Sequence, residues 1–312
     1  MKSPVRKMFD GIASRYDFLN HFLSCFQDVL WRRHCCCRLK KMMGERLAAA
    51  CGVRLLDLCG GTGDFAVTFE KLCGRPAMAI LGDFSFGMLR GAAGKKTSAA
   101  AVQLDAMKMP FADRQFDVIL NGFGMRNVPD ARGALLESFR VLDNGGYLCV
   151  LEFFSPRNLF NRFFYKVLAP LFIPVMGAFF SGKREAYEYL VNSIIRFLPV
   201  DGFCKLAEEC GFEVKHVKMF DGGISFGVFL QKPQETNVAA GDATVASSAA
   251  AAVNVSADNL AGNAAVADAD AAPSIAAASG KVIASEDVSV AVENVAGATR
   301  NVADVSRGDA VR

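Results

Sequence analysis

Short apolar runs alternate with stretches of helical periodicity through the middle of this chain. Five of these runs predict strands that are buried on both faces: 53–58, 77–82, 101–104, 116–120 and 147–153. Apolar residues recur at helical spacing in three segments between them: 65–73, 87–95 and 131–142. Because strands that alternate with helices form parallel sheets covered on both faces, the pattern predicts an α/β fold.

The pattern changes toward residue 232, where two strand candidates follow each other directly. Segments 213–220 and 225–231 are separated by Asp221-Gly222-Gly223, a turn typical of an antiparallel hairpin. Upstream, 27–43 is interpreted as a basic helix with Trp31 on its apolar side. We therefore expect a Rossmann-like, mostly parallel seven-stranded sheet, with an antiparallel edge hairpin and an N-terminal helical cap.

Composition divides the 312 residues into two parts. Segment 233–312 is rich in Ala, has no aromatic residue, and carries ten acidic and four basic residues, a net charge of −6. The first 232 residues hold all 26 Phe and a net charge of +9. Since 233–312 lacks an apolar stripe that could bury enough surface to offset ordering, we expect one folded domain, 1–232, followed by a low-complexity, disordered tail, 233–312.

The ten cysteines and the N-terminus indicate a cytoplasmic protein. The N-terminus has basic residues but no apolar core of the kind found in signal peptides. No Cys-x-x-Cys pair occurs, so we interpret the cysteines as reduced, packed thiols. The alternative is a zinc site built from Cys35, Cys36, Cys37 and His34. Adjacent helical residues diverge by ~100° and cannot converge on one ion, so we expect no metal.

A glycine-rich loop follows the first predicted strand and precedes a helix. It runs from Leu56 to Asp64, LDLCGGTGD, and such a loop brings backbone close to a bound ligand. Its spacing departs from Gly-x-Gly-x-x-Gly, since Gly61 and Gly63 are followed by Ala66. Carboxylates at Asp57 and Asp64 would repel a dinucleotide pyrophosphate but favour a ligand that carries an ammonium or sulfonium group.

Acidic residues also follow the second and third predicted strands. Asp83 can accept both hydroxyls of a ribose, and Asp105, followed by Ala106, can accept from an adenine amino group. Each Asp alone could equally be a helix cap or a turn residue. Three acidic residues at successive strand ends, in this order, fit S-adenosylmethionine better than a nicotinamide dinucleotide.

Several segments together resemble the UbiE/MenG family of class I S-adenosylmethionine-dependent methyltransferases. They are the cofactor loop, GDFSFGML, DAMKMPFADRQFDVI, RVLDNGGYLCVLEF, REAYEYLVNSIIRF and, most specific, VRKMFDGIASRYDFLN and GFGMRNVPD. The resemblance covers roughly residues 5–232. It implies the class I methyltransferase fold and C-methylation of the reduced ring of demethylmenaquinol or of a ubiquinone precursor. The sequence does not choose between these two quinone pathways.

The resemblance also assigns cofactor contacts. It implies that Thr62, Asp83 and the Asp105-Ala106 pair contact S-adenosylmethionine, and that Asp57 and the loop glycines Gly61 and Gly63 shape the site of its methionine end. The family often has Asn where this chain has Asp105, so the side chain here accepts but does not donate. Some members carry a contacting Ser where this chain has Gly122, which predicts a backbone contact or none.

The expected reaction transfers a methyl group to an aromatic carbon, which needs an electron-rich, reduced quinol ring. We expect Arg126, at the mouth of the sheet, to stabilise the developing oxyanion, and Asn127 to orient a water or a hydroxyl. Tyr16, with Asp17 in the N-terminal cap, supplies a further candidate proton contact. The alternatives are an ion pair of Arg126 with a carboxylate such as Asp130, and a purely packing role for Tyr16.

A polyprenylated quinol needs an apolar channel or a membrane surface. The candidate lid is 159–180; its charge-free part, 167–181, is shorter than a membrane span and is interrupted by two prolines. Basic residues on both sides suit peripheral contact with the inner face of the membrane, and an ordinary buried segment capping the site is the alternative. The basic residues match no nucleic-acid-binding module, so we expect no nucleic-acid partner.

Two other functions remain open at this point. One is methylation of another prenylated or small aromatic acceptor, and the other is a catalytically inactive protein that binds the cofactor or a quinone. A homodimer is compatible with the sequence, which does not fix the oligomeric state.

Overall fold

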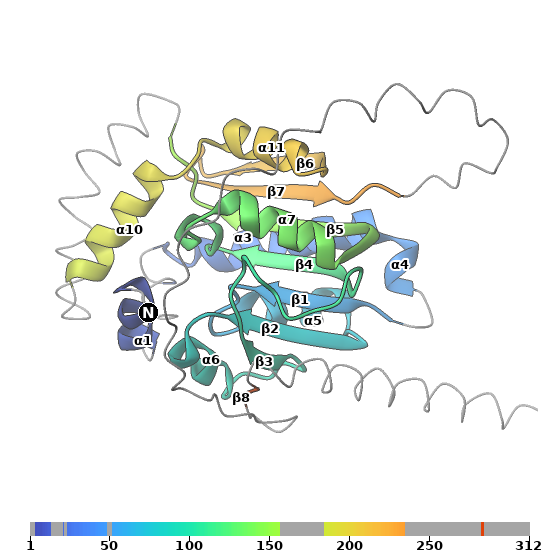
Figure 1. The fold of residues 1–312 in the computed structure, drawn as a ribbon, viewed down its shortest axis with the longest axis horizontal. Coiled ribbons are helices and arrows are strands. Elements are labelled where there is room, and N and C mark those ends of the chain that lie inside the picture. The colour runs from blue at the N-terminus through green and yellow to red at the C-terminus, as the bar shows by residue number, and fades with distance from the viewer. Residues whose placement is uncertain are drawn as a thin grey trace, which may run out of the picture. The chain divides into compact units, whose positions relative to one another are not determined.

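A computed structural model describes residues 4–13, 21, 24–48, 52–156, 184–234 and 282–283. Within these ranges the strands form one sheet, in the order β6-β7-β5-β4-β1-β2-β3-β8 (Figure 1). The strands are β1 (Arg54–Leu58), β2 (Met78–Asp83), β3 (Ala100–Gln103), β4 (Phe116–Gly122), β5 (Leu142–Glu152), β6 (Glu213–Phe220), β7 (Ser225–Gln231) and β8 (Val282–Ile283). Strands β1 to β5 run parallel, and β7 is antiparallel to both β5 and β6. Strands β1 to β7 confirm the predicted Rossmann-like, seven-stranded sheet with an antiparallel edge hairpin, and β8 adds a two-residue strand beside β3 that the sequence did not predict.

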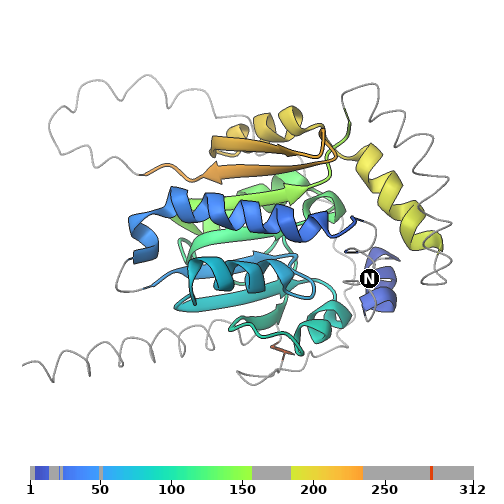
Figure 2. The same ribbon diagram turned by 180° about the vertical axis from the view of Figure 1, so that it is seen from behind.

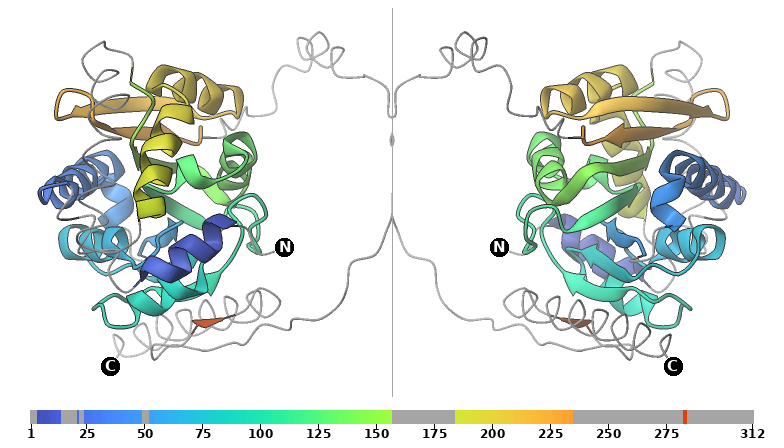
Figure 3. Two further views of the ribbon diagram at one scale, coloured as in Figure 1. Left: turned by 90° about the vertical axis from the view of Figure 1, so that its left-hand side faces the viewer. Right: turned by 90° about the vertical axis from the view of Figure 1, so that its right-hand side faces the viewer.

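Helices cover both faces of this sheet. They are α1 (Pro4–Ile12), α3 (Gln27–Met43), α4 (Glu45–Ala48), α5 (Asp64–Cys73), α6 (Phe86–Ala92), η2 (Met125–Asn127), α7 (Ala131–Val141), α10 (Arg184–Arg196) and α11 (Val200–Glu209). Helices α7 and α11 lie on one face, and α3 and α5 lie on the other (Figures 1 and 2). Helices α1, α6 and α10 lie at the end of the sheet where the parallel strands finish, which faces the viewer in the left panel of Figure 3.

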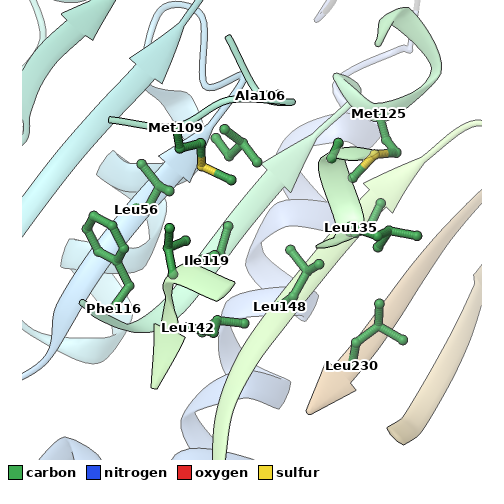
Figure 4. Close-up of a cluster of buried hydrophobic side chains, with 14 of the residues drawn as sticks. Leu56, Ala106, Met109, Phe116, Ile119, Met125, Leu135, Leu142, Leu148 and Leu230 are labelled. Carbon is green, nitrogen blue, oxygen red and sulfur yellow. The ribbon is translucent and has the colours of Figure 1, made fainter. Parts of the chain in front are cut away.

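Two apolar layers hold the sheet between the helices. On the α7 side, Leu56, Ile119 and Leu148 of the strands pack against Leu135 of α7 and Met125 of η2 (Figure 4). On the α3 side, a second cluster joins the sheet to α3 and α5: Trp31, Cys35, Leu39, Leu55, Phe65, Phe69, Val118 and Cys149. Since successive strand residues point to opposite faces, strands buried on both sides need the continuous apolar runs that the sequence has.

Strand β5 differs from its predicted extent. It begins at Leu142, directly after α7, rather than at residue 147. Leu142 pairs with Phe116, and the register then shifts before Tyr147 pairs with Val118. The polar and glycine residues between them, DNGG, read as a loop in the sequence because a bulged strand start carries no apolar alternation.

Two predicted segments lie mostly or entirely outside the described residues. These are the candidate lid, 159–180, and the tail, 233–312, of which 233–234 and the two-residue strand β8 are described. Val282 of β8 pairs in parallel with Ala101 of β3. The predictions for both segments stay predictions. In the ranges that the structure describes, no helix has the length and apolar character needed to cross a bilayer.

Candidate active site

The loop between β1 and α5 depends on its glycines, because a Cβ at Gly60 would collide with neighbouring atoms. A Cβ at Gly60 would lie 2.4 Å from Leu81 Cδ1 and 2.6 Å from the carboxyl carbon of Asp57. Gly61 and Gly63 have φ of 57° and 82°, the left-handed region that glycine adopts at little cost. The Gly60 N–H donates to the Gly82 carbonyl at 3.1 Å, which joins the loop to β2. The glycines therefore pack the loop tightly against the ends of two strands.

Asp57 is fully buried beneath this loop. Its Oδ2 accepts from the Ala66 N–H at 2.9 Å, while Oδ1 has no hydrogen-bond partner in the part of the chain that the structure describes. Burial raises the pKa of Asp57 to about 7. An acceptor that is buried and unsatisfied costs free energy unless a ligand supplies a donor. A cationic donor at this loop would satisfy Oδ1, so the residues present fit the ammonium group of S-adenosylmethionine.

Asp83 ends β2 and is also buried. Its carboxylate accepts from the backbone N–H of Gly61 at 3.0 Å and of Ser85 at 2.8 Å. Burial raises the pKa of Asp83 to about 6. Next to it, the Ser85 hydroxyl bonds to Asp10 Oδ1 at 2.5 Å, so α1 reaches the mouth of the site. Asp83 was predicted from the sequence, whereas Ser85 and Asp10 were not.

Thr62 and Asp64 take part in a network of charges around the start of α5. Lys95 Nζ donates to the Thr62 hydroxyl at 2.9 Å and pairs with Asp64. Arg32 Nη1 and His21 Nε2 each lie 3.8 Å from Asp64 Oδ2. Three basic side chains that are distant in sequence therefore surround one carboxylate. Because of their separation, the sequence did not identify these partners.

Three further residues were predicted at the cofactor site: Asp105, Ala106 and Gly122. Asp105 is exposed, and its Oδ1 accepts from the Met107 N–H at 2.9 Å. The side chain of Ala106 packs in the apolar cluster with Met109, as Figure 4 shows, so only its backbone is available to a ligand. A Cβ on Gly122 would lie 3.0 Å from Phe65 Cδ1. Phe65 therefore occupies the space next to Gly122, and the predicted backbone contact of Gly122 stays a prediction.

Arg126 lies in the short helix η2, just beyond the end of β4. Its side chain is 6% exposed and pairs with Glu152, which is fully buried at the end of β5, with Nη1 2.5 Å from Oε1. Nη1 also donates to the Phe123 carbonyl at 2.7 Å, and Nε donates to the Ser193 hydroxyl of α10 at 3.3 Å. Among the described residues, Nη2 of Arg126 makes no hydrogen bond. The guanidinium is thus held rigidly with one amino group unused.

The ion pair weighed as the alternative for Arg126 is present, but with Glu152 instead of Asp130. The Asp130 side chain accepts from the Arg132 N–H at 2.9 Å and caps α7. Glu152 also accepts from the backbone N–H of Phe153 and of Arg126. Burial raises the pKa of Glu152. Its signal in the sequence is a single carboxylate within the apolar run YLCVLEF.

The side-chain amide of Asn127 bridges the Phe123 backbone and helix α10. Its Nδ2 donates to the Phe123 carbonyl at 3.2 Å, and its Oδ1 accepts from the Tyr189 hydroxyl of α10 at 3.1 Å. Tyr189 was not predicted from the sequence. Tyr16 and Asp17 lie outside the described residues, so their proposed contact stays a prediction.

Comparison with known proteins identifies the family. The model of the ubiE/COQ5 methyltransferase family matches residues 1–229. Demethylmenaquinone methyltransferases of Staphylococcus aureus strains JH9 and Newman are each 36% identical over 228 residues, which cover 72% of this chain and 91% of theirs.

Solved structures resemble the chain more distantly. A SAM-dependent methyltransferase from Aquifex aeolicus is 18% identical, with a TM-score of 0.41 over 58% of this chain and 82% of that one. An S-adenosylmethionine-dependent methyltransferase from Mesorhizobium loti is 18% identical, with a TM-score of 0.42 over 58% and 91%. The family match spans the whole described sheet apart from β8 and the last residues of β7. The chain belongs to the ubiE/COQ5 methyltransferase family and is a methyltransferase whose cofactor is S-adenosylmethionine.

Proposed function

We propose that this protein methylates a ring carbon of demethylmenaquinol. The observation that carries the proposal is the 36% identity to the Staphylococcus aureus demethylmenaquinone methyltransferases over 91% of their length. The family model, which matches residues 1–229, spans the cofactor loop, the Arg126 segment and α10, and this supports placing both halves of the candidate site within the family's domain. The alternative acceptors, a ubiquinone precursor or another aromatic ring, are the outcomes that the test below separates.

The cofactor end of the site is built from Asp57, Asp83 and the glycine loop. When bound, S-adenosylmethionine supplies an electrophilic methyl group on a sulfonium. The buried carboxylate of Asp57 attracts the positive charge of that ligand, and Asp83 offers carboxylate oxygens to its hydroxyls. The two carboxylates lie at the ends of adjacent strands, since Leu58 pairs with Gly82.

The acceptor end is built around Arg126. A ring carbon becomes nucleophilic when negative charge develops on a neighbouring ring oxygen, and a fixed donor aimed at that oxygen lowers the barrier. Nη2 of Arg126 is such a donor, because Glu152, Phe123 and Ser193 hold the rest of the guanidinium. Since the positions of those partners are fixed, little reorganisation is needed when charge develops.

The test supplies the purified protein with S-adenosylmethionine and one of two chemically reduced acceptors. These are a short-chain demethylmenaquinone and a prenylated benzoquinol that represents the ubiquinone pathway, and the methylated product is detected by mass spectrometry. Methylation of the naphthoquinol supports the proposal. Cofactor binding without methylation of that ring, or turnover of the benzoquinol alone, would overturn it.

A variant pair assigns the chemistry to Arg126. Arg126→Ala removes the free donor and should lower kcat by about 10²- to 10³-fold while changing cofactor affinity far less. Arg132→Ala is the matched control, because Arg132 of α7 forms an exposed ion pair with Glu209 of α11. Equal losses of kcat and cofactor affinity in Arg126→Ala would contradict the assigned role.

We also propose that the exposed face of α3 contacts an anionic lipid surface. Phe26, just before α3, and Val29 and Leu30 are 61%, 40% and 47% exposed near its N-terminus. Four exposed basic side chains continue the same face: Arg33, Arg38, Lys40 and Lys41. The acidic residue of the helix, Asp28, is buried. An apolar end followed by a basic stripe suits a helix lying at a charged membrane surface.

Vesicle flotation tests this contact. The full chain should float with vesicles that contain phosphatidylglycerol more than with vesicles of phosphatidylcholine alone, and Arg38→Glu/Lys41→Glu should reduce that difference. Lys205→Glu on α11 is the control, because it removes an exposed cation from the opposite face of the sheet. Light scattering of the same samples tests the homodimer.

A further inference from the structure

Helix α10 brings a tyrosine to the acceptor end of the site. The Tyr189 hydroxyl lies 3.1 Å from Oδ1 of Asn127. One turn further along the same helix, the Ser193 hydroxyl accepts from Nε of Arg126. Tyr189 is half-buried and lies close enough to Arg126 and Glu152 for both charges to act on it. The tyrosine therefore lies beside the guanidinium whose Nη2 makes no bond within the described residues.

The direction of the hydrogen bond between Tyr189 and Asn127 is fixed by a backbone carbonyl. The Phe123 carbonyl can only accept, so the group of Asn127 that faces it, 3.2 Å away, is the Nδ2 donor. The other end of the amide, facing Tyr189, is then Oδ1, which can only accept. The hydroxyl proton of Tyr189 is therefore committed to Asn127.

The Phe123 carbonyl is itself held in place. Phe123 has a φ of 58°, its N–H donates to the Leu151 carbonyl at 2.8 Å, and Nη1 of Arg126 bonds to its carbonyl at 2.7 Å. If the amide of Asn127 were reversed, its Oδ1 would face the Phe123 carbonyl oxygen, and two acceptors would lie opposite each other. The orientation is thus imposed by backbone and not by the tyrosine.

This arrangement leaves the Tyr189 oxygen as an acceptor. Burial raises the pKa of Tyr189, so the phenol keeps its proton at neutral pH. That proton points at Asn127, and within the described ranges no N–H or O–H group donates to the phenol oxygen. Its lone pairs are available to a ligand that carries a donor.

We propose that Tyr189 accepts a hydrogen bond from a ring hydroxyl of the acceptor and thereby selects the quinol over the quinone. A quinol hydroxyl has a proton to donate, whereas a quinone carbonyl can only accept and would face the Tyr189 oxygen without a bond. Nη2 of Arg126 donates to an oxygen in either state and does not discriminate. This inference rests on the proposed function, since it assumes a quinol acceptor.

The experiment compares the affinities of the two redox states. A short-chain demethylmenaquinone, oxidised or chemically reduced, is titrated anaerobically into the full chain without cofactor. Binding is followed by the fluorescence of Trp31, the single Trp, whose ring centroid is 6.2 Å from that of Phe123. The measured quantity is the ratio of the quinone Kd to the quinol Kd. The wild-type protein should bind the quinol more tightly.

Tyr189→Phe removes the acceptor and keeps the ring. The quinol Kd should rise about three- to tenfold, the range for one net hydrogen bond, while the quinone Kd stays unchanged. Tyr147→Phe is the matched control, because the Tyr147 hydroxyl bonds to the Met42 carbonyl on the α3 side, and it should leave the ratio unchanged.

Asn127→Leu tests the direction of the bond while Tyr189 is retained. Without Oδ1, the tyrosine hydroxyl is free to rotate and donate to a quinone carbonyl. The quinone Kd should fall relative to the quinol Kd, which a merely structural role of Asn127 does not predict. This variant also keeps the proposal testable if Tyr189→Phe does not fold.

The outcomes separate this inference from the proposed function. A ratio that Tyr189→Phe or Asn127→Leu leaves at the wild-type value overturns the selection by Tyr189, even where the wild-type protein methylates demethylmenaquinol. Absence of methylation by the wild-type protein overturns the proposed function. Equal wild-type affinities for the quinone and the quinol overturn the inference directly.

Discussion

Glu152→Gln is the sharpest test of how the acceptor end is held together. The substitution keeps the size of the side chain and removes its charge. Glu152 is fully buried, and its carboxylate accepts from Nη1 and the backbone N–H of Arg126 and from the Phe153 N–H. An amide can accept at one oxygen only, so one of its NH₂ protons would face an N–H donor. The Arg126 charge would remain buried without a counter-charge.

The expected cost is large because both partners are buried. Removing one member of a buried ion pair costs about 3–5 kcal/mol, which for a folded body of this size corresponds to a fall in Tm of roughly 6–20 °C. Glu137→Gln is the comparison variant, because it removes the charge of a carboxylate in a partly exposed ion pair. Glu137 pairs with Arg140 at side-chain exposures of 21% and 32%, and loss of such a partly solvated pair costs about 1 kcal/mol or less.

Both variants are measured by thermal unfolding and by turnover. Glu152→Gln should lower Tm several times more than Glu137→Gln and should also lower kcat, since the Arg126 guanidinium loses its anchor. Equal Tm shifts in the two variants would refute the assignment of Glu152 as the buried counter-charge. Wild-type kcat in a folded Glu152→Gln protein would refute its role in positioning Arg126.

Three further predictions address both ends of the site. Because the pKa of Asp57 is about 7, its ionised fraction grows between pH 6 and pH 8. The affinity for the cationic cofactor, measured by calorimetry, should therefore rise about tenfold over this range, and Asp57→Asn should remove most of this pH dependence. Gly60→Ala should lower the free energy of unfolding measured in urea by about 1–3 kcal/mol, since its Cβ would overlap Leu81. Arg126→Lys should keep Tm closer to wild type than Glu152→Gln does, because the charge opposite Glu152 remains, yet kcat should fall by about 10²-fold as the unused donor is lost.

Most of the fold could be predicted because the sheet is buried on both faces. The apolar runs at 53–58 and 77–82 match β1 (Arg54–Leu58) and β2 (Met78–Asp83) to within a residue at each end. The hairpin strands β6 and β7 have the predicted bounds, since the turn Asp221-Gly222-Gly223 punctuates them. The error at the start of β5 arose where a bulge interrupts the alternation that the prediction relies on.

The cofactor end was predictable for a related reason. Parallel strands finish at one edge, so residues that follow successive strands meet there whatever their separation in sequence. Asp57 and Asp83 were predicted in this way, and the structure places both near the ends of adjacent strands. The side chains that complete this end, His21, Arg32 and Lys95, come from elements whose packing the local pattern does not encode.

At the acceptor end, proximity in sequence pointed to the wrong partner for Arg126. Asp130 is four residues from Arg126 and was the natural partner by proximity, but the start of α7 engages its carboxylate as a cap. The register between β4 and β5 brings the actual partner, Glu152, next to Arg126. Gly122 pairs with Leu151 and the Phe123 N–H bonds to the Leu151 carbonyl, so the chain leaving β4 passes beside Glu152. A carboxylate at the end of one strand thus meets a guanidinium just past the end of its neighbour.

The turn at Phe123 orients the polar side chains of the acceptor end. A φ of 58° is rare for a bulky residue and persists only where surrounding contacts compensate its cost. Here the compensation is visible: the Phe123 ring stacks on Phe153 at a centroid distance of 4.7 Å, and its carbonyl accepts from both Arg126 and Asn127. The guanidinium of Arg126 lies 5.5 Å from the centroid of the Phe153 ring. One strained residue therefore orients both polar side chains of the acceptor end, so a substitution of Phe123 that relaxed φ would disturb Arg126 and Asn127 together.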